Sequence, residues 1–258
     1  MVLNVPLAVT FDLWQTLIFE SGGSGRSSKR KELRISCIAG FLSAHSEPVN
    51  EGFIGYQLQR LSNEIIAGQD LGFDDCLDKR ISTLLERLAP GLPDQIGERG
   101  VNNLRHCIDD TFLESPPQLV EGVPSLIDSL RQQGIRIGLI SNAGLTSGEA
   151  QRRWFGTLGL LDRFDYLAFS SDLSVAKPAK KIFELTLDAI GITPEYALHV
   201  GDNIHTDIGG SAAVGMSTVW VAGGVQSKLS PATRPDYAIN SVLDLRPVVD
   251  HWMENLVG

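Results

Sequence analysis

A few polar residues stand just after short apolar runs and could do chemistry together. Asp12 follows LAVTF, Ser141 follows IRIGLI, and Asp202 follows ALHVG, with Asp207 five residues further on. Lys177 precedes a proline in the segment between them. A carboxylate can attack phosphorus and form an acyl phosphate, which divides one difficult displacement into two easier ones. These residue types predict nucleophilic catalysis, provided that the fold brings them together.

Three of these residues are acidic, so their charges must be balanced. Like charges ~4 Å apart repel by about 4 kcal/mol at an effective dielectric near 20. Asp12, Asp202 and Asp207 must therefore take up protons or surround a cation. Mg²⁺ binds through one or two carboxylates together with substrate phosphate and water. We therefore expect Mg²⁺ as the cofactor.

Short apolar segments alternate with helical ones over most of the chain. The expected strands are residues 7–11, 135–140, 167–170, 197–200 and 217–221. Helices are expected near residues 147–158, 179–190 and 206–214 and from residue 242 onwards. This alternation predicts an α/β fold, a doubly wound (Rossmann-like) parallel sheet covered on both faces. Ligands bind outside the carboxyl ends of such strands, where the polar residues stand.

The chain between the first two expected strands has a helical pattern. Apolar residues recur there at helical spacing, as in Leu58, Leu61 and Ile65. Residues 21–31, SGGSGRSSKRK, indicate a flexible hinge, and Pro116 with Pro117 ends the helical block. We therefore expect an α/β core of residues 1–20 and 117–258 and an inserted all-helical cap of residues 21–116.

These segments, taken in order, resemble the four motifs of the haloacid dehalogenase (HAD) superfamily. The matching stretches are DLWQT from residue 12, LISNA from 139, VAKPAKKIF from 175 and HVGDNIHTDIGG from 199. The helical insert lies where many members carry a cap. The resemblance implies that Asp12 is the nucleophile and that Lys177 neutralises it and the transferring group.

The same resemblance implies the remaining site residues. Thr16, Ser141 and the backbone amide of Asn142 would bind the phosphoryl oxygens. The metal would be held by Asp12, Asp202 and one main-chain carbonyl, with a further carboxylate as ligand or near neighbour. That carbonyl belongs to Trp14, and the further carboxylate is Asp207.

Two residues depart from the family pattern. Phosphatases of the superfamily carry a general-acid Asp where this chain has Trp14. General acid catalysis is typically worth ~10²- to 10⁴-fold, so its loss favours acyl or aryl leaving groups, or slow turnover. We expect Trp14 to pack beneath the cap. Gln15 replaces the usual Gly, so the loop geometry can differ.

The favoured function is a Mg²⁺-dependent phosphatase acting on a small phosphorylated metabolite. One alternative is metal-free hydrolysis of a 2-haloacid, because dehalogenases proper have an aromatic residue at the Trp14 position. Arg26, Arg30 or Arg34 would then contact the substrate anion, although Asp202 favours a metal. A second alternative is a catalytically weakened protein that binds a phosphorylated ligand.

The composition excludes several classes of protein and partner. With 31 acidic and 22 basic residues the net charge is −9, which repels nucleic acid. No apolar run reaches the ~18 residues that span a bilayer, and the N-terminus lacks a signal-peptide pattern. We expect a cytoplasmic monomer or homodimer. Cys37, Cys76 and Cys107 are widely spaced, which predicts reduced, buried thiols.

Overall fold

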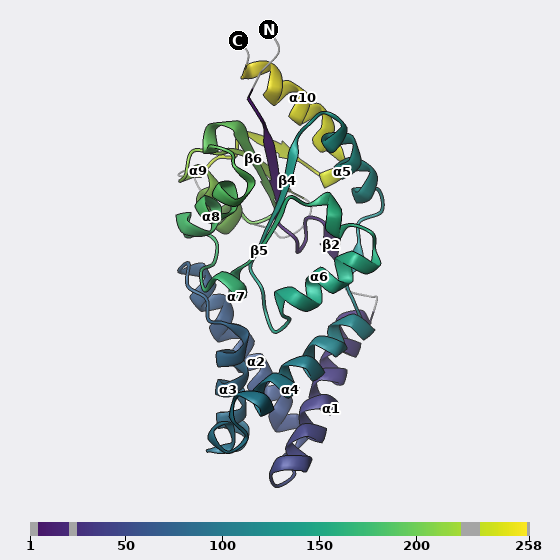
Figure 1. Ribbon diagram of the computed structural model, residues 1–258, viewed down its shortest axis with the longest axis vertical. Helices are drawn as coiled ribbons and strands as arrows, with labels where there is room; N and C mark the ends of the chain where they lie inside the picture. The colour runs from purple at the N-terminus through teal and green to yellow at the C-terminus, as the bar shows by residue number, and fades with distance from the viewer. Residues whose placement is uncertain (1–4, 21–24, 223–232, 257–258) are drawn as a thin grey trace.

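A six-stranded sheet forms the centre of the protein in the computed structural model, which describes residues 5–20, 25–222 and 233–256 (Figure 1). The strand order is β5-β4-β1-β6-β7-β8, and all neighbouring strands are parallel. The strands are β1 (Ala8–Phe11), β4 (Arg136–Ser141), β5 (Tyr166–Phe169), β6 (Ala197–Gly201), β7 (Ser217–Val221) and β8 (Tyr237–Ile239). The predicted doubly wound parallel sheet is confirmed, and β8 adds an edge strand that was not predicted.

Four helices form a separate block below the sheet (Figure 1). They are α1 (Arg26–His45), α2 (Glu51–Asp70), α3 (Leu77–Leu88) and α4 (Leu92–Glu114). Their apolar faces meet in a core of their own, which includes Ile38, Ile54, Leu84 and Leu104. Residues 25–116 contain no β-strand, as the helical pattern predicted. We call this block the cap.

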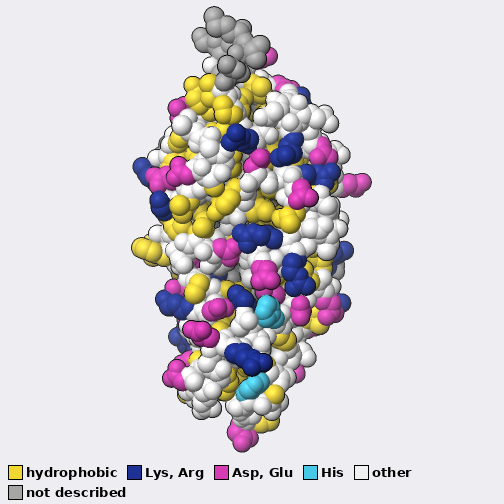
Figure 2. Space-filling model, viewed as in Figure 1, with side chains coloured by type: hydrophobic (Ala, Val, Ile, Leu, Met, Phe, Trp, Pro, Cys, Tyr) yellow, Lys and Arg dark blue, Asp and Glu magenta, His cyan; other side chains and the backbone are white. Residues whose placement is uncertain are grey.

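The surface carries charges of both signs. Figure 2 shows Lys and Arg side chains interspersed with Asp and Glu along the whole length of one face. Among the described residues, none of the helices combines the length and the apolar character needed to cross a membrane. The predicted nucleic-acid and oligomer properties stay predictions.

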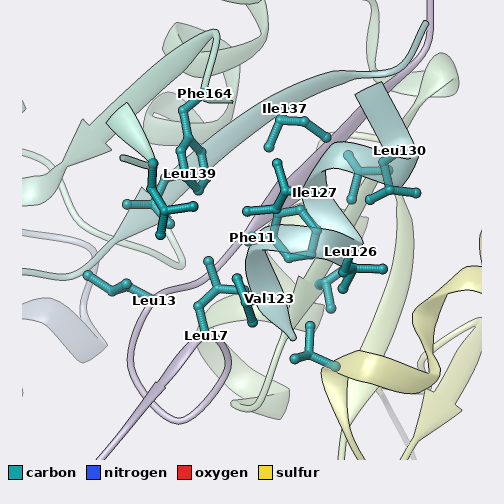
Figure 3. Close-up of a cluster of buried hydrophobic side chains, with 14 of the residues drawn as sticks. Phe11, Leu13, Leu17, Val123, Leu126, Ile127, Leu130, Ile137, Leu139 and Phe164 are labelled. Atoms are coloured by element: carbon teal, nitrogen blue, oxygen red, sulfur yellow. The ribbon is translucent and has the colours of Figure 1, made fainter. Parts of the chain in front are cut away.

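Alternate residues of β1 face opposite layers of helices. Val9 and Phe11 pack with α5 (Val123–Gln132), as Figure 3 shows for Phe11, and with α6 (Gly148–Thr157) and α10 (Leu245–Asn255). Ala8 instead packs with α8 (Lys180–Ile190). Short helical segments complete the core: α7 (Ser170–Leu173), α9 (Gly210–Ala212) and a π-helical turn at Ile204–Gly209. Both faces are therefore covered, so a ligand must bind at an edge of the sheet, and in parallel sheets that is the carboxyl edge.

The connections between core and cap differ from the predicted hinge. Residues 21–24 of that hinge lie outside the described residues, and Arg26 to Lys31 are the first turns of α1 rather than a flexible loop. The chain enters and leaves the cap through an antiparallel ribbon of β2 (Ile18–Phe19) and β3 (Gln118–Leu119). Two-residue strands leave no periodic pattern, so the sequence did not predict them.

The cysteines also differ from the prediction of three reduced, buried thiols. Cys37 of α1 and Cys107 of α4 form a disulfide across the cap, with a Cα–Cα distance of 6.2 Å. Cys76 is free but exposed. The prediction is wrong because helix packing joins residues that are 70 positions apart, which spacing alone does not reveal.

Candidate active site

The predicted catalytic residues gather at the carboxyl edge of the sheet. Asp12 follows β1, Ser141 ends β4, and Asp202 follows β6, and these three strands are neighbours. A cavity of about 580 Å³ lies above them, and its lining includes α1 and α2 of the cap. The site is therefore formed by core and cap together.

Lys177 joins two carboxylates at the bottom of this cavity. Its Nζ lies 2.6 Å from Asp12 Oδ1 and 2.7 Å from Asp207 Oδ1, and it donates to the Ile140 carbonyl oxygen at 2.7 Å. Lys177 is only 1% exposed. Burial alone would lower the pKa of Lys177, but the two carboxylates raise it above its ordinary value. Lys177 is therefore held as a buried cation against the proposed nucleophile. We call Asp12, Lys177, Asp202 and Asp207 the floor.

The three carboxylates of the floor have different proton affinities. Burial raises the pKa of Asp12 to about 6, against the lowering effect of Lys177. Burial and the charges of Asp12 and Asp207 raise the pKa of Asp202 to about 8. Burial also opposes ionisation of Asp207, yet the Lys177 charge holds the pKa of Asp207 below its ordinary value. Without a second cation the floor cannot keep all three carboxylates ionised at neutral pH.

The donor set suits a hard divalent cation. One oxygen from each of Asp12, Asp202 and Asp207 lies within 4.8 Å of the other two. Asp12 Oδ2 is buried and has no hydrogen-bond partner. Asp207 is already engaged, because its Oδ1 contacts Lys177 and its Oδ2 accepts from the Asn203 amide at 2.9 Å. Asp12 and Asp202 are thus the better ligands for Mg²⁺, and Asp207 fits the role of a neighbour that holds Lys177.

The predicted phosphate-binding residues fall into two groups. The hydroxyl oxygens of Thr16 and Ser141 are buried without a hydrogen-bond partner, although neither residue is among those that line the cavity. The Asn142 side chain instead exchanges two 2.9 Å hydrogen bonds with the backbone of Lys177. Asn142 lines the cavity as well, but its side chain positions the lysine. Binding of a phosphoryl oxygen by its backbone amide stays a prediction.

The loop of Trp14 and Gln15 separates the floor from the cap. Trp14 is half-buried, lines the cavity, and has the Arg30 guanidinium 5.8 Å from its ring centroid. It therefore packs beneath the cap. Gln15 has a φ of 61°, in the left-handed region that favours glycine. The loop thus keeps a glycine-type conformation although the glycine is absent.

Several supporting residues were not identified from the sequence as parts of the site. His199 of β6 contacts Asp207 Oδ1 at 3.3 Å and Thr10 at 2.8 Å, and burial lowers its pKa, so it packs as a neutral residue. Trp220 of β7 donates its indole N–H to the backbone oxygen of Asp202 at 2.8 Å. In the sequence, only the position of His199 in an expected strand could have indicated its place in the site, and nothing indicated that of Trp220.

Side chains of the cap form hydrogen bonds with the loop that follows Ser141. Arg80 of α3 donates to the carbonyl oxygens of Ala143, at 2.8 Å, and of Gly144, and it pairs with Asp74. Gln69 of α2 donates to the same Ala143 oxygen at 2.7 Å. The side chains of Arg80 and Asp74 are each 2% exposed. A buried ion pair in the cap therefore holds a core loop beside the floor.

Comparisons with known proteins agree with this arrangement. Residues 7–215 match the family described as haloacid dehalogenase-like hydrolase. The chain is 27% identical over 247 residues to a glyceraldehyde 3-phosphate phosphatase of Methanopyrus kandleri, covering 94% of this chain and 96% of that one. It is 31% identical to a phosphoserine phosphatase of Thermus thermophilus, over 46% of this chain and 45% of that one.

Solved structures show the same fold. A 2-haloacid dehalogenase from Pseudomonas syringae pv. tomato DC3000 has a TM-score of 0.68 at 21% identity, covering 96% of this chain and all of that one. A HAD phosphatase from Thermococcus onnurineus has a TM-score of 0.60 at 21% identity, with 94% and 97% covered. With the match over most of its length, this chain belongs to the haloacid dehalogenase-like hydrolase family and is a hydrolase.

Proposed function

We propose that this hydrolase is a Mg²⁺-dependent phosphatase that transfers a phosphoryl group from a small metabolite to Asp12 and then to water. The observation that carries the proposal is the floor, where Lys177 lies 2.6 Å from Asp12 beneath the cavity. The phosphatase activities named for the relatives from Methanopyrus and Thermus support the same reaction class.

Each residue of the site has a part in the first step. A carboxylate oxygen of Asp12 attacks phosphorus, the bond from phosphorus to the ester oxygen breaks, and an acyl phosphate forms on Asp12. Lys177 holds the nucleophile in place and offsets negative charge on the transferring group. The free hydroxyls of Thr16 and Ser141 donate to phosphoryl oxygens. When bound by Asp12, Asp202 and the Trp14 carbonyl, Mg²⁺ supplies positive charge to those oxygens.

The second step returns the enzyme to its starting state. Water attacks phosphorus of the acyl phosphate, inorganic phosphate leaves, and the Asp12 carboxylate is restored. Trp14 stands where other family members have an acid, and an indole N–H can donate a hydrogen bond but is far too weak an acid to transfer its proton to a leaving alcohol. We therefore expect turnover to rise as the leaving group becomes more acidic, from alkyl to aryl to acyl phosphates.

Phosphate release from glycerol 3-phosphate, p-nitrophenyl phosphate and acetyl phosphate tests the proposal. Each assay is run with Mg²⁺ or EDTA on wild type, Asp12→Asn and Asp172→Asn. Asp172 is the matched control, because it also stands near the end of a strand, β5, but pairs with Arg152 at 2.8 Å. Only Asp12→Asn and EDTA should abolish turnover. Equal turnover by wild type and Asp12→Asn would rule out covalent catalysis at this residue, and indifference to EDTA would rule out the metal.

Two further results would replace the proposal by another function. Halide release from 2-chloropropionate in EDTA would make the chain a dehalogenase. Tight binding of phosphate esters by wild type without any turnover would make it a binding protein. Asp202 argues against the first, because a haloacid would bring a further carboxylate to three others. The replacement at Trp14 is the feature that would explain the second.

A further inference from the structure

The cap side of the cavity is basic, whereas the floor is acidic. Arg30, Lys31 and Arg34 of α1 all line the cavity, and we call them the cap wall. Lys31 is exposed, but Arg30 is 6% exposed and Arg34 is half-buried. A buried cation is stable only with a partner of opposite charge or with hydrogen-bond acceptors. The contacts of Arg30 and Arg34 therefore decide whether either side chain is left to bind a ligand.

Arg30 is fully compensated inside the protein. It forms an ion pair with Glu20 and donates to the Ser115 carbonyl oxygen at 2.8 Å. Its guanidinium also lies 5.8 Å from the ring centroids of Trp14 and Phe112. Arg30 therefore has a structural role and offers little to a ligand.

Arg34, one helical turn later, lacks such compensation. Its Nη2 donates to the Thr146 hydroxyl at 2.8 Å, but its Nε is buried without a hydrogen-bond partner. Arg34 forms no ion pair with any acidic residue in the part of the chain that the structure describes. Asp109 raises the pKa of Arg34 through its charge, but its oxygens accept hydrogen bonds from the Ser147 amide and hydroxyl, at 2.8 and 2.6 Å, and not from the guanidinium.

The positive charge of Arg34 persists despite its surroundings. Burial, with repulsion from Arg30, lowers the pKa of Arg34 to about 10, which still leaves it protonated at neutral pH. Asp109 acts on this charge from nearby but makes no ion pair with the guanidinium, so an anion in direct contact with Arg34 would still be stabilising. The cap wall therefore has one guanidinium N–H, at Arg34 Nε, that is buried and still able to donate to an anion.

A second cavity provides the room for that anion. A space of about 130 Å³ is lined by Trp14, Arg30, Arg34 and Thr146, among others, and it shares the first three with the main cavity. Gln151 also lines it, and its buried, unpartnered Oε1 can accept from a ligand hydroxyl but does not pair with a carboxylate. Since one water occupies about 30 Å³ in the liquid, a carboxylate can be accommodated. This side cavity adjoins the main one along Trp14.

We propose that Arg34 and the side cavity bind a carboxylate of the substrate, so that the substrate class is the phosphate monoester of a short hydroxy acid. The inference rests on the proposed phosphatase function for the phosphoryl end of that substrate only. The molecule would lie from Asp12 along Trp14 to Arg34, because Trp14 lines both cavities. A guanidinium pairs with a carboxylate through two parallel hydrogen bonds, which gives the site its selectivity.

Two esters that differ in one group provide the test. 3-Phosphoglycerate ends in a carboxylate where glycerol 3-phosphate ends in a hydroxymethyl group. Binding of both is measured by calorimetry with Mg²⁺ in the Asp12→Asn protein, so that the result does not depend on turnover. We expect the carboxylate ester to bind roughly 10- to 100-fold more tightly, the range of a charge-assisted pair. Adding Arg34→Gln should remove this preference and leave glycerol 3-phosphate almost unchanged.

Arg60→Gln is the matched control, because Arg60 lies on the exposed side of α2 and pairs with Glu64. It should keep the preference. Arg34→Lys retains the charge without the two-pronged geometry and should give an intermediate preference, which also decides the question if Arg34→Gln does not fold. Equal affinity for the two esters, or a preference unaffected by either Arg34 substitution, would overturn the inference. Failure of wild type to release phosphate from any ester would instead overturn the proposed function alone.

Discussion

The floor and the cap wall both bury charge beside one cavity, but they do so differently. In the floor, Lys177 pairs with two of the three carboxylates, and the pKa values of the three spread from below the ordinary range to about 8. In the cap wall, Arg30 is neutralised by Glu20 while Arg34 is not. The floor therefore has an excess of negative charge that suits a metal, and the wall has an excess of positive charge that suits an anion. Charges left unbalanced on opposite sides indicate where each end of a substrate is held.

The largest expected effect comes from breaking the floor with Lys177→Met. The substitution leaves Asp12 and Asp207 buried without their shared cation, and losing one partner of a buried pair costs about 3–5 kcal/mol. Turnover should fall by roughly 10²- to 10³-fold, as when one preorganised donor is lost. Phosphate release and chemical unfolding measure the two effects. Lys181→Met, an exposed lysine in α8, is the control, and a Lys177→Met enzyme of normal activity would contradict the assigned role.

The buried ion pair of Arg80 and Asp74 in the cap allows the same test away from the floor. Arg80→Met leaves Asp74 without its ion-pair partner and the Gly144 carbonyl without its Arg80 donor, while Gln69 still donates to Ala143. We therefore expect a loss of about 3–5 kcal/mol in the free energy of unfolding. Turnover should fall much less than in Lys177→Met, because Arg80 contacts only a loop. Lys79, its neighbour, pairs with Asp75 on the surface. Lys79→Met should therefore lower the free energy of unfolding by less than about 1 kcal/mol.

These two outcomes separate stability from chemistry. If Arg80→Met were no more destabilising than Lys79→Met, the cap pair would not hold the loop. If its turnover fell as far as that of Lys177→Met, the loop would need the cap to complete the catalytic arrangement. Unfolding curves and saturating kinetics on the same preparations distinguish the two results.

The floor should also make stability depend on pH in a direction set by its raised pKa values. Asp12 and Asp202 have folded pKa values of about 6 and about 8, against an ordinary value of 3.8. Between pH 4 and 8 the metal-free folded state thus holds more protons than the unfolded state, so its stability falls as pH rises. The lowered pKa of Asp207 acts only at more acidic pH.

Mg²⁺ should reverse this trend, because it binds the deprotonated carboxylates. We expect the gain in Tm on adding Mg²⁺ to increase from pH 5 to pH 8.5, and Asp202→Asn to abolish most of that increase. Thermal unfolding in EDTA and in Mg²⁺ measures it. A gain that does not change with pH would mean that the cation binds away from the floor.

The floor and the cap wall also differ in how much of their structure could be predicted from the sequence. Asp12 and Asp202 were predictable, because each follows an apolar strand at an edge where parallel strands place their ligands. The cap residues were not, because the unpaired state of Arg34 and the Cys37–Cys107 disulfide depend on long-range helix packing. The division into a core of residues 1–20 and 117–258 and a cap of residues 21–116 stays a proposal, supported by their separate apolar clusters.

The smallest expected effect lies at Gln15, between the two regions. Gln15 adopts a φ of 61° and donates its amide to the Ile18 oxygen at 2.8 Å. Glycine takes this conformation without strain, so Gln15→Gly should raise the free energy of unfolding by about 0.5–1 kcal/mol after the greater freedom of glycine in the unfolded chain is counted. Ser174, with a φ of 55° and no place in the cavity lining, is the matched control.

Comparing the two substitutions shows whether the side chain of Gln15 contributes to substrate binding or whether only the backbone conformation at this position matters. Ser174→Gly should bring a similar gain in stability and leave KM unchanged. Gln15 lines the cavity, so a KM that rises in Gln15→Gly while stability also rises would mean that its side chain contacts the substrate. If Gln15→Gly instead lowers stability while Ser174→Gly raises it, the strain at Gln15 is smaller than the side-chain contacts and the chain entropy that oppose the substitution.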